Sequence, residues 1–317
     1  MRNDGGESVS ERVARAVLGE YGVDPDGVER GRGWTNLTWL GEELVVRVAS
    51  RPGAADLLRE TRLLRLLPPE VGCPPVVDAG VRDGHEWVLT RRVPGVNLEE
   101  VWPSLDAVAR ARALGQMWER ARHIHRVDTA AAAPYARSRS PFFAGSPAAA
   151  TASLDRLVGA GLLTAPQART LGGVLDRFWA ALPHAPEVLD HGDFCAPNTL
   201  WHEGNVVALL DFEFAVVAPV TVDLNEAVKM AFVPGGPAGL EPLQEVVRRI
   251  AASTLDLPGG PEVLVGHAVM LETWVLENEL ASEDPDENDR ADATARLTAF
   301  AEQDGGLYAP LLADLRR

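Results

Sequence analysis

Residues 188–201 read VLDHGDFCAPNTLW, and the short stretch LLDFE follows at residues 209–213. Each stretch places an aspartate after an apolar run, Asp193 in the first and Asp211 in the second, with Asn198 between them. Magnesium prefers oxygen ligands, so the Asn198 amide oxygen and the Asp211 carboxylate are suited to hold it. A carboxylate such as that of Asp193 can accept a hydroxyl proton and aim the hydroxyl oxygen at a phosphate. The pattern therefore predicts magnesium-assisted phosphoryl transfer.

The spacing also predicts a hairpin that joins the two candidate metal ligands. Residues 199–201 and 205–210 have the apolar, β-branched character of strands. His202-Glu203-Gly204 between them suits a tight turn. Such a hairpin would deliver Asp211 beside Asn198.

Residues 188–201 resemble the catalytic loop of the aminoglycoside phosphotransferase family, whose members are relatives of the protein kinases and choline kinases. Pro219 and Asp223 match the proline and aspartate that the family places after the metal-binding aspartate. The resemblance covers nearly the whole chain, from Gly31 to the C-terminal helices. It implies an α+β class and a bilobal protein-kinase-like fold. Residues 1–93 would form a small antiparallel-sheet N-terminal lobe that binds the nucleotide, and residues 94–317 a mostly helical C-terminal lobe that holds the catalytic and acceptor sites.

The resemblance implies roles for the polar residues of this region. Asp193 would be the catalytic residue, and Asn198 and Asp211 would bind Mg²⁺. His191 and Asp223 would support the loop without reacting.

The N-terminal third supplies the expected nucleotide site. Residues 31–40 and 43–49 read as antiparallel strands around a glycine-containing turn that can cover phosphates. Arg47 stands where the family carries a lysine or arginine that touches the α/β-phosphates, a departure from the protein-kinase lysine. A helix expected over residues 54–67 and ended by Pro68-Pro69 carries Glu60, which would pair with that cation. Residues 87–98 read as a strand that leads into the hinge, where backbone groups would bind the base. The expected nucleotide-binding residues are Gly31, Gly33, Asn36, Arg47, Glu60, Arg91 and Val93.

Composition agrees with an ordinary globular protein of two lobes. The chain has 317 residues, of which 46% are hydrophobic and 24% charged. Its 46 acidic and 30 basic residues give a net charge of −16, which argues against nucleic acid or an anionic membrane as partner. The polar N-terminus and the lack of a long apolar run predict a cytoplasmic protein, and we expect a monomer or homodimer. Cys73 and Cys195 cannot form a disulfide framework, and Cys195 is expected to be a small filler.

Acidic residues are concentrated between residues 272 and 289. Glu272, Glu277 and Glu279 are the candidates there to attract a cationic acceptor. A solvated helix end and loop is the simpler explanation of the same cluster.

Helical periodicity predicts further helices over residues 8–21, 105–125, 153–161, 165–182, 240–257, 261–281 and 289–304. His123 and His125 are interpreted as structural, because neither has a metal-ligand partner three or four residues away. The Ala-, Ser- and Pro-rich residues 129–147 are expected to form a mobile surface connection.

Together these features predict a phosphotransferase that uses Mg²⁺ and ATP (or GTP) and moves the γ-phosphate to a hydroxyl of a small molecule, with a cationic acceptor as one candidate. The resemblance points to an antibiotic such as an aminoglycoside, with choline, homoserine or sugar kinases as alternatives. A kinase-like binding protein without turnover is another hypothesis, which only the departure at Arg47 favours. A metal-dependent hydrolase that uses His191 and Asp193 would need a further histidine cluster that the sequence lacks. The acceptor, its reacting hydroxyl and the preferred base stay open.

Overall fold

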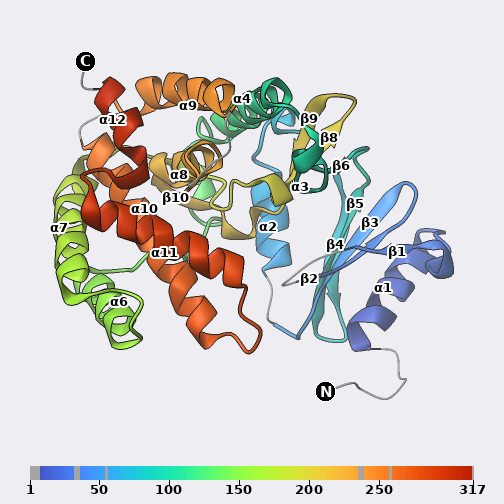
Figure 1. Cartoon of the computed structure of the whole chain (residues 1–317). Helices are drawn as coiled ribbons and strands as arrows, with labels where there is room; N and C mark the ends of the chain where they lie inside the picture. The colour runs from blue at the N-terminus through green and yellow to red at the C-terminus, as the bar shows by residue number, and fades with distance from the viewer. Residues whose placement is uncertain (1–7, 32–35, 54–55, 235–238, 257–258, 316–317) are drawn as a thin grey trace.

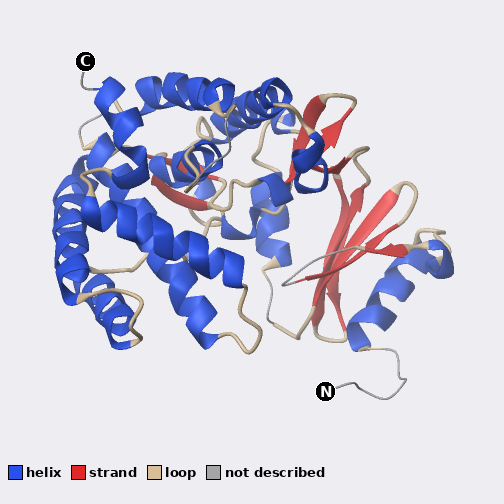
Figure 2. Ribbon diagram, in the orientation of Figure 1, coloured by secondary structure: helices blue, strands red, loops and turns tan. Residues whose placement is uncertain are grey.

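The computed structural model describes residues 8–31, 36–53, 56–234, 239–256 and 259–315, so the predicted phosphate residue Gly33 lies outside the described residues. In Figure 1 an antiparallel sheet with helix α1 on its outer side occupies one end of the molecule. A larger helical part occupies the other end, and α2 lies between the two. Figure 2 shows the remaining strands as a hairpin near the top and a short pair inside the helical part.

In the described part of the chain, five strands form the N-terminal sheet in the order β1-β2-β3-β5-β4, with every neighbouring pair antiparallel. On β3, Val46 and Val48 pack against the buried side chains of α1, which confirms the predicted first helix and strand pair. Because side chains alternate between the faces of a strand, Arg47 faces the opposite way, toward α2. The elements are α1 (Val9–Glu20), β1 (Glu29–Arg30), β2 (Asn36–Leu40), β3 (Leu44–Ala49), β4 (Val76–Arg82) and β5 (His85–Arg91).

Helix α2 (Leu57–Leu64) belongs to both parts of the molecule. Leu57 packs with residues of the sheet, whereas Leu63 lies in the core of the helical part. The helix ends three residues before the predicted end at Leu67. Pro68 and Pro69 have no N–H groups to bond the preceding carbonyls, so the last turn tightens before them.

The helical part surrounds α10 (Gly260–Ala281), which is buried over most of its length. All the predicted helices are present, with ends shifted by up to six residues. Helix α8 (Thr221–Ala231) was not predicted, because its sequence mixes β-branched and short polar residues of modest helix propensity, and it is buried on most sides. The other helices are α3 (Leu98–Val101), α4 (Ala107–Ile124), α5 (Thr129–Ala132), α6 (Pro147–Gly159), α7 (Ala165–Ala181), α9 (Glu241–Thr254), α11 (Glu287–Glu302) and α12 (Ala309–Leu315).

The predicted hairpin is confirmed as β8 (Thr199–His202) and β9 (Asn205–Leu209), joined by a turn in which Glu203 and Gly204 have φ of 47° and 80°. The Leu210 N–H donates to the Asn198 carbonyl at 2.8 Å, so the open end of the hairpin places Asp211 next to Asn198 along the sheet. Strand β6 (Val96–Asn97) pairs with β8. Two further strands, β7 (Glu187–Asp190) and β10 (Val216–Pro219), pair with each other, and β7 leads into the loop that carries Asp193.

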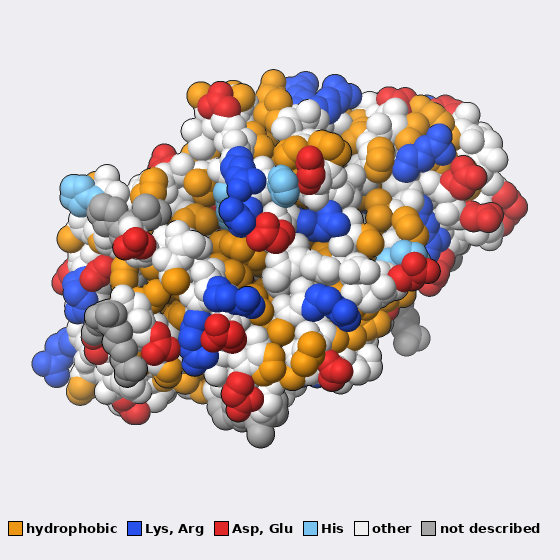
Figure 3. Space-filling model, turned by 90° about the horizontal axis from the view of Figure 1, so that it is seen from above, with side chains coloured by type: hydrophobic (Ala, Val, Ile, Leu, Met, Phe, Trp, Pro, Cys, Tyr) orange, Lys and Arg blue, Asp and Glu red, His pale blue; other side chains and the backbone are white. Residues whose placement is uncertain are grey.

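The expectation of a mobile connection over residues 129–147 is wrong. The Arg137 N–H donates to the Ala215 carbonyl at 2.7 Å, and Ala136 and Ser140 are buried. Small side chains let this segment pack closely against the chain that follows Asp211. None of the helices in the described ranges is both long and apolar enough to cross a bilayer. On the face in Figure 3, acidic and basic side chains are interspersed among apolar ones.

Candidate active site

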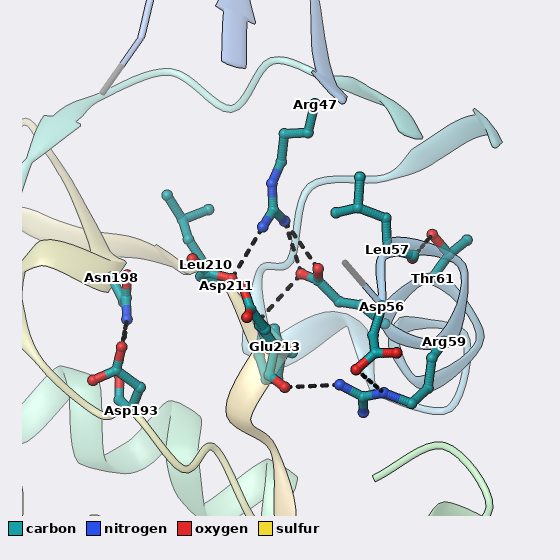
Figure 4. A network of polar contacts seen from close by, with 12 residues as sticks. Arg47, Asp56, Leu57, Arg59, Thr61, Asp193, Asn198, Leu210, Asp211 and Glu213 are labelled. Atoms are coloured by element: carbon teal, nitrogen blue, oxygen red, sulfur yellow. Dashed lines mark hydrogen bonds and ion pairs between the residues drawn. The ribbon is translucent and has the colours of Figure 1, made fainter. Parts of the chain in front are cut away.

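Asp193 and Asn198 are joined directly in the loop between β7 and β8. The Asn198 Nδ2 group donates to the Asp193 carboxylate at 2.8 Å and to the Asp193 carbonyl at 3.0 Å. Figure 4 shows this pair beside Asp211. Because the nitrogen of the amide is used inside the loop, the amide oxygen of Asn198 is left to accept a ligand.

Asp223, at the start of α8, holds the loop from below. Its fully buried carboxylate accepts the N–H groups of His191 and Gly192 at 2.9 and 3.0 Å, and it contacts His125 Nε2 at 2.9 Å. Burial alone raises the pKa of Asp223, but the hydrogen bond and positive charge from His125 outweigh it, so the pKa lies below its usual range. The carboxylate therefore stays charged and keeps its backbone donors.

The His191 ring connects the loop to the strand end before Asp211. Its Nε2 lies 2.9 Å from the Leu210 carbonyl, and its Nδ1 accepts the Asp193 N–H at 3.3 Å. A carbonyl can only accept and an amide N–H can only donate, so the proton resides on Nε2 of a neutral ring. Both ring nitrogens are used, which leaves His191 in contact with the backbone on either side.

Arg47 binds two carboxylates from separate segments of the chain. Its Nη1 lies 2.9 and 3.1 Å from the two Glu60 oxygens, and its Nη2 lies 3.0 Å from Asp211 Oδ1, as Figure 4 shows. Burial lowers the pKa of Arg47, but the charges of Glu60 and Asp211 raise it by more than burial lowers it. The net pKa is raised, so the guanidinium stays charged. Glu60 also accepts the Phe212 N–H at 3.2 Å. The sheet, α2 and the segment after β9 therefore meet at one cation.

Arg59 anchors α2 to the helical part, a role that the sequence did not reveal. Its two Nη groups donate to the carbonyls of Tyr135 and Glu213 at 2.5 and 2.7 Å. Figure 4 shows Arg59 between Asp56 and Glu213. The acceptors are backbone groups 76 and 154 residues away along the chain, so no motif could have indicated them.

The remaining nucleotide candidates lie along the N-terminal sheet. Gly31 donates its N–H to the Thr38 carbonyl at 3.0 Å, and Asn36 is buried at the start of β2. At the hinge, the Arg91 N–H already donates to the Pro75 carbonyl at 2.8 Å, and the N–H of the next residue, Arg92, also donates to a backbone carbonyl. The N–H of Val93 has no bond to another described residue. Backbone recognition of a base at the hinge would therefore fall to Val93.

The three acidic acceptor candidates on α10 all have partners inside the protein. Glu272 is 1% exposed and faces Lys229 and Arg296 at 3.4 and 3.5 Å. Glu277 pairs with Arg156 at 2.6 Å, and Glu279 accepts the Asp286 N–H at 2.6 Å. Contact between Glu272 or Glu277 and an acceptor would require these ion pairs to open.

A buried cluster of His125, Asp190 and Asp223 has ligand atoms within 4.8 Å of one another. Both Asp223 oxygens already accept hydrogen bonds. Burial, and then the Asp223 charge, raises the pKa of Asp190 well above its usual range. The group is thus suited to a shared proton network. The hydrolase hypothesis would need a metal site that includes His191 and Asp193, and this group contains neither residue.

The donors around Asp211 fit a magnesium ion. Asp211 is 35% exposed, and Arg47 contacts only its Oδ1. The second Asp211 oxygen and the Asn198 amide oxygen are hard donors of the type that Mg²⁺ prefers.

Comparison with known proteins gives one family and one fold. A sequence model of the phosphotransferase enzyme family matches residues 26–257. The structure is similar to aminoglycoside 2'-phosphotransferase-IIIa in its GDP complex, with a TM-score of 0.68 and 19% identity, over 93% of this chain and 99% of that one. It is also similar to macrolide 2'-phosphotransferase MphH from Brachybacterium faecium, with a TM-score of 0.57 and 22% identity, over 91% of this chain and 97% of that one.

A third similar structure is a thermostable mutant of aminoglycoside phosphotransferase APH(4)-Ia with ADP and hygromycin B, with a TM-score of 0.63 and 17% identity. It matches over 91% of this chain and 97% of that one. Curated protein sequences gave no match. At these identities the structural likenesses establish the fold, and they confirm the predicted bilobal kinase-like architecture.

Proposed function

The chain belongs to the phosphotransferase enzyme family and is a small-molecule kinase, and from this premise we propose that it moves the γ-phosphate of ATP or GTP to a hydroxyl of its acceptor. The observation that carries the proposal is the Arg47 fork, which joins Glu60 of α2 to Asp211 beside the Asp193–Asn198 pair. This arrangement supports an assembled phosphoryl-transfer site. It also argues against a silent binding protein, since Arg47 makes the contacts expected of the family cation.

In the proposed mechanism Asp193 accepts the proton of the acceptor hydroxyl and orients its oxygen in line with the γ-phosphate. Asn198 fixes the Asp193 carboxylate through its Nδ2 group, and His191 and Asp223 keep the loop backbone in place. Arg47 neutralises phosphate charge, and the Val93 N–H binds the edge of the base. When bound, Mg²⁺ would be held by Asn198 and Asp211 and would neutralise charge on the phosphate oxygens.

An antibiotic such as an aminoglycoside is the acceptor that we propose first. Solved relatives of this fold include a kanamycin complex and a hygromycin B complex of aminoglycoside phosphotransferases, and also a macrolide phosphotransferase. A small metabolite of the choline, homoserine or sugar type is the alternative. A cytoplasmic location and a monomeric or homodimeric state stay predictions.

Magnesium-dependent turnover tests the proposal. The purified protein is incubated with ATP or GTP and a panel of hydroxylated acceptors, and phosphorylated product is measured by mass spectrometry. Asp193→Ala should lower kcat by at least about 100-fold, because the acceptor oxygen loses its orienting base. Asp155→Asn, on the exposed surface of α6, is the control that should keep full activity. Near-normal turnover of Asp193→Ala would show that the base lies elsewhere.

A second arm separates the kinase from a binding protein. Nucleotide binding without transfer or hydrolysis in wild-type protein would exclude the proposed activity. Removal of Mg²⁺ by EDTA should abolish turnover and leave the fold intact, as circular dichroism would report.

A further inference from the structure

Asp211 has a backbone conformation that few residues other than glycine adopt. Its φ is 61° and its ψ is 74°, in the left-handed region. Aspartate tolerates this region better than most residues do, but such a conformation persists only where the surrounding structure holds it. Because Asp211 supplies a proposed metal ligand, the contacts that hold its backbone also set the direction of its carboxylate.

The chain that follows Asp211 makes a single tight turn. The Phe212 N–H donates to Glu60 at 3.2 Å, and residues Phe212–Phe214 form one 3₁₀ turn, η6. The Ala215 N–H closes this turn on the Phe212 carbonyl at 3.2 Å. One turn has few hydrogen bonds of its own, so contacts from other segments must stabilise it.

Two arginines from separate segments converge on this turn. The Glu213 carbonyl accepts hydrogen bonds from Arg59 Nη2 and from Arg137 Nε, both at 2.7 Å. Figure 4 shows the Arg59 contact. A carbonyl oxygen has two lone pairs, so the two donors use its full capacity. Hydrogen bonds from charged donors are stronger than those between neutral groups, so the position of this carbonyl is well fixed.

Arg137 contacts four successive residues of the chain after Asp211. Besides the carbonyl, its Nη2 lies 3.3 Å from Glu213 Oε1, and its guanidinium carbon lies 5.1 Å from the centre of the Phe214 ring. Its own N–H donates to the Ala215 carbonyl at 2.7 Å, and its backbone pairs with Val216 in a parallel bridge. Side chain and backbone of one residue therefore hold the whole turn.

The other contacts of the two arginines distinguish their roles. Arg59 belongs to α2 and also reaches the Tyr135 carbonyl, so its loss would loosen that helix as well. Arg137 pairs with Asp56 too, but at 3.7 Å, which is longer than a hydrogen bond. Arg137 thus acts mainly on the turn.

We propose that Arg137 positions Asp211 for the metal ion by holding the turn that follows it. With the Glu213 carbonyl fixed, Asp211 Oδ1 stays 3.0 Å from Arg47 Nη2, and the second carboxylate oxygen is presented to Mg²⁺. Arg137 touches no substrate and no reacting atom, so it is a positioning residue. The role rests on the proposed kinase function, and it gives the packed residues 129–147 a part in assembling the site.

Metal binding tests this role without relying on turnover. Mn²⁺ accepts the same oxygen ligands as Mg²⁺, and its binding to the protein with ADP can be followed by electron paramagnetic resonance. Arg137→Gln keeps a hydrogen-bond donor and loses the charge and the planar fork, so it should weaken Mn²⁺ binding by roughly tenfold. ADP binding in the presence of EDTA should change little, because no metal ligand contributes to it.

Turnover provides a second readout. At limiting Mg²⁺ the rate of Arg137→Gln should fall below that of wild type, and saturating Mg²⁺ should restore most of it. A merely structural defect would lower the rate at every Mg²⁺ concentration.

Two further variants separate positioning from folding. Arg137→Lys keeps the charge and can still reach one acceptor, so its Mn²⁺ affinity should lie between those of wild type and Arg137→Gln. It carries the test by itself if Arg137→Gln does not fold. Arg139→Gln removes an exposed cation from the same segment and should leave Mn²⁺ affinity and turnover unchanged. Melting temperatures of all variants report any loss of structure.

Distinct outcomes would overturn the inference. Wild-type Mn²⁺ affinity in Arg137→Gln, or in Arg137→Lys where only that variant folds, would exclude the positioning role. Equal weakening of Mn²⁺ binding and of metal-free ADP binding, or a lower melting temperature with wild-type Mn²⁺ affinity, would assign Arg137 a structural role instead. Wild-type protein that binds Mn²⁺ with ADP and transfers no phosphate to any acceptor would refute the proposed function, and the Mn²⁺ affinities of the variants would still decide the role of Arg137.

Discussion

Gly192 illustrates how one backbone position controls the catalytic loop. Its φ is +84°, and a Cβ at this position would lie 2.0 Å from the Phe214 carbonyl oxygen. Such a contact with backbone cannot be relieved by rotating a side chain. Only glycine therefore lets the loop pass this close to the chain that follows Asp211.

We predict that Gly192→Ala lowers the free energy of unfolding by about 3 kcal/mol or more, because the clash adds to backbone strain. Gly161→Ala is the matched control, since Gly161 has φ of +74° and a Cβ there would meet no described atom within 4 Å beyond its chain neighbours. That variant should cost only about 1 kcal/mol. Urea denaturation measures both, and equal losses would mean that the Phe214 contact is unimportant.

Arg47 is the residue at which this chain departs from the protein-kinase lysine. Its two Nη groups reach different carboxylates, which a single ammonium on a flexible stem does less well. We predict that Arg47→Lys raises the nucleotide KM or lowers kcat by roughly tenfold. Arg51→Lys, at an exposed position after β3, is the control. Unchanged kinetics in Arg47→Lys would show that charge alone suffices.

At the residue scale, motif spacing is enough to nominate Asp193, Asn198 and Asp211, and the family resemblance adds Glu60 and Arg47. Spacing is not enough for His125, whose partner Asp223 lies 98 residues away. The lack of a local metal partner indicates only a structural role for His125, and its contact with a carboxylate from another helix cannot be read from its neighbours. Spacing reports residues that act within one loop, and tertiary contacts add the others.

Helix α2 is the element that connects the two parts of the molecule. Glu60 meets the sheet through Arg47, and Arg59 meets the helical part through the carbonyls of Tyr135 and Glu213. Adjacent residues on one helix therefore link opposite sides of the site.

We predict that Arg59→Ala lowers stability by roughly 1–3 kcal/mol, because two hydrogen bonds from a partly buried charged group are lost. It should also lower kcat, since Glu60 is held less firmly against Arg47. Arg62→Ala, an exposed position on the same helix, should change neither quantity by much. Thermal unfolding and steady-state kinetics provide the comparison, and similar behaviour of the two variants would contradict the anchoring role.

At the element scale, the longer helices were predictable and α8 was not. Its sequence TVDLNEAVKMA mixes β-branched and short polar residues that have modest helix propensity. Packing on several sides stabilises it instead. The same limit applies to β7 and β10, which are four residues each and depend on pairing with distant segments, with each other and, for β10, with Arg137.

The stability of the whole molecule should depend on pH through His267. This ring is buried, lies 3.0 Å from the Thr221 hydroxyl, and packs beside Phe143 and Phe178. Burial lowers the pKa of His267 to about 3. Below pH 6.5 the unfolded chain binds a proton that the folded chain does not, so this residue makes stability fall as pH drops from 6.5 toward 3.

The slope from this one group cannot exceed about 1.4 kcal/mol per pH unit. We predict that His267→Gln has a flatter stability profile between pH 6.5 and 4 than wild type, measured by urea denaturation. Asp190 has the opposite effect on the pH dependence of stability, because its raised pKa makes the folded state bind the extra proton. Its effect cancels in the comparison, since wild type and His267→Gln both contain Asp190. His184→Gln is an exposed control, and a profile as flat as that of His267→Gln would contradict the assignment.

The sequence by itself determined the order of the main helices, and its resemblance to a known family implied the fold class and the candidate phosphate-handling residues. The helices follow from hydrophobic periodicity, and the loop candidates follow from polar residues at fixed spacing, both of which are local properties of the chain. Only the tertiary structure decided that α2 is anchored by Arg59, that residues 129–147 are packed, and that Glu272 and Glu277 are paired with cations of the protein. Each of these depends on side chains brought together from distant segments, and charge or burial at such contacts is a property of the folded neighbourhood rather than of the local sequence.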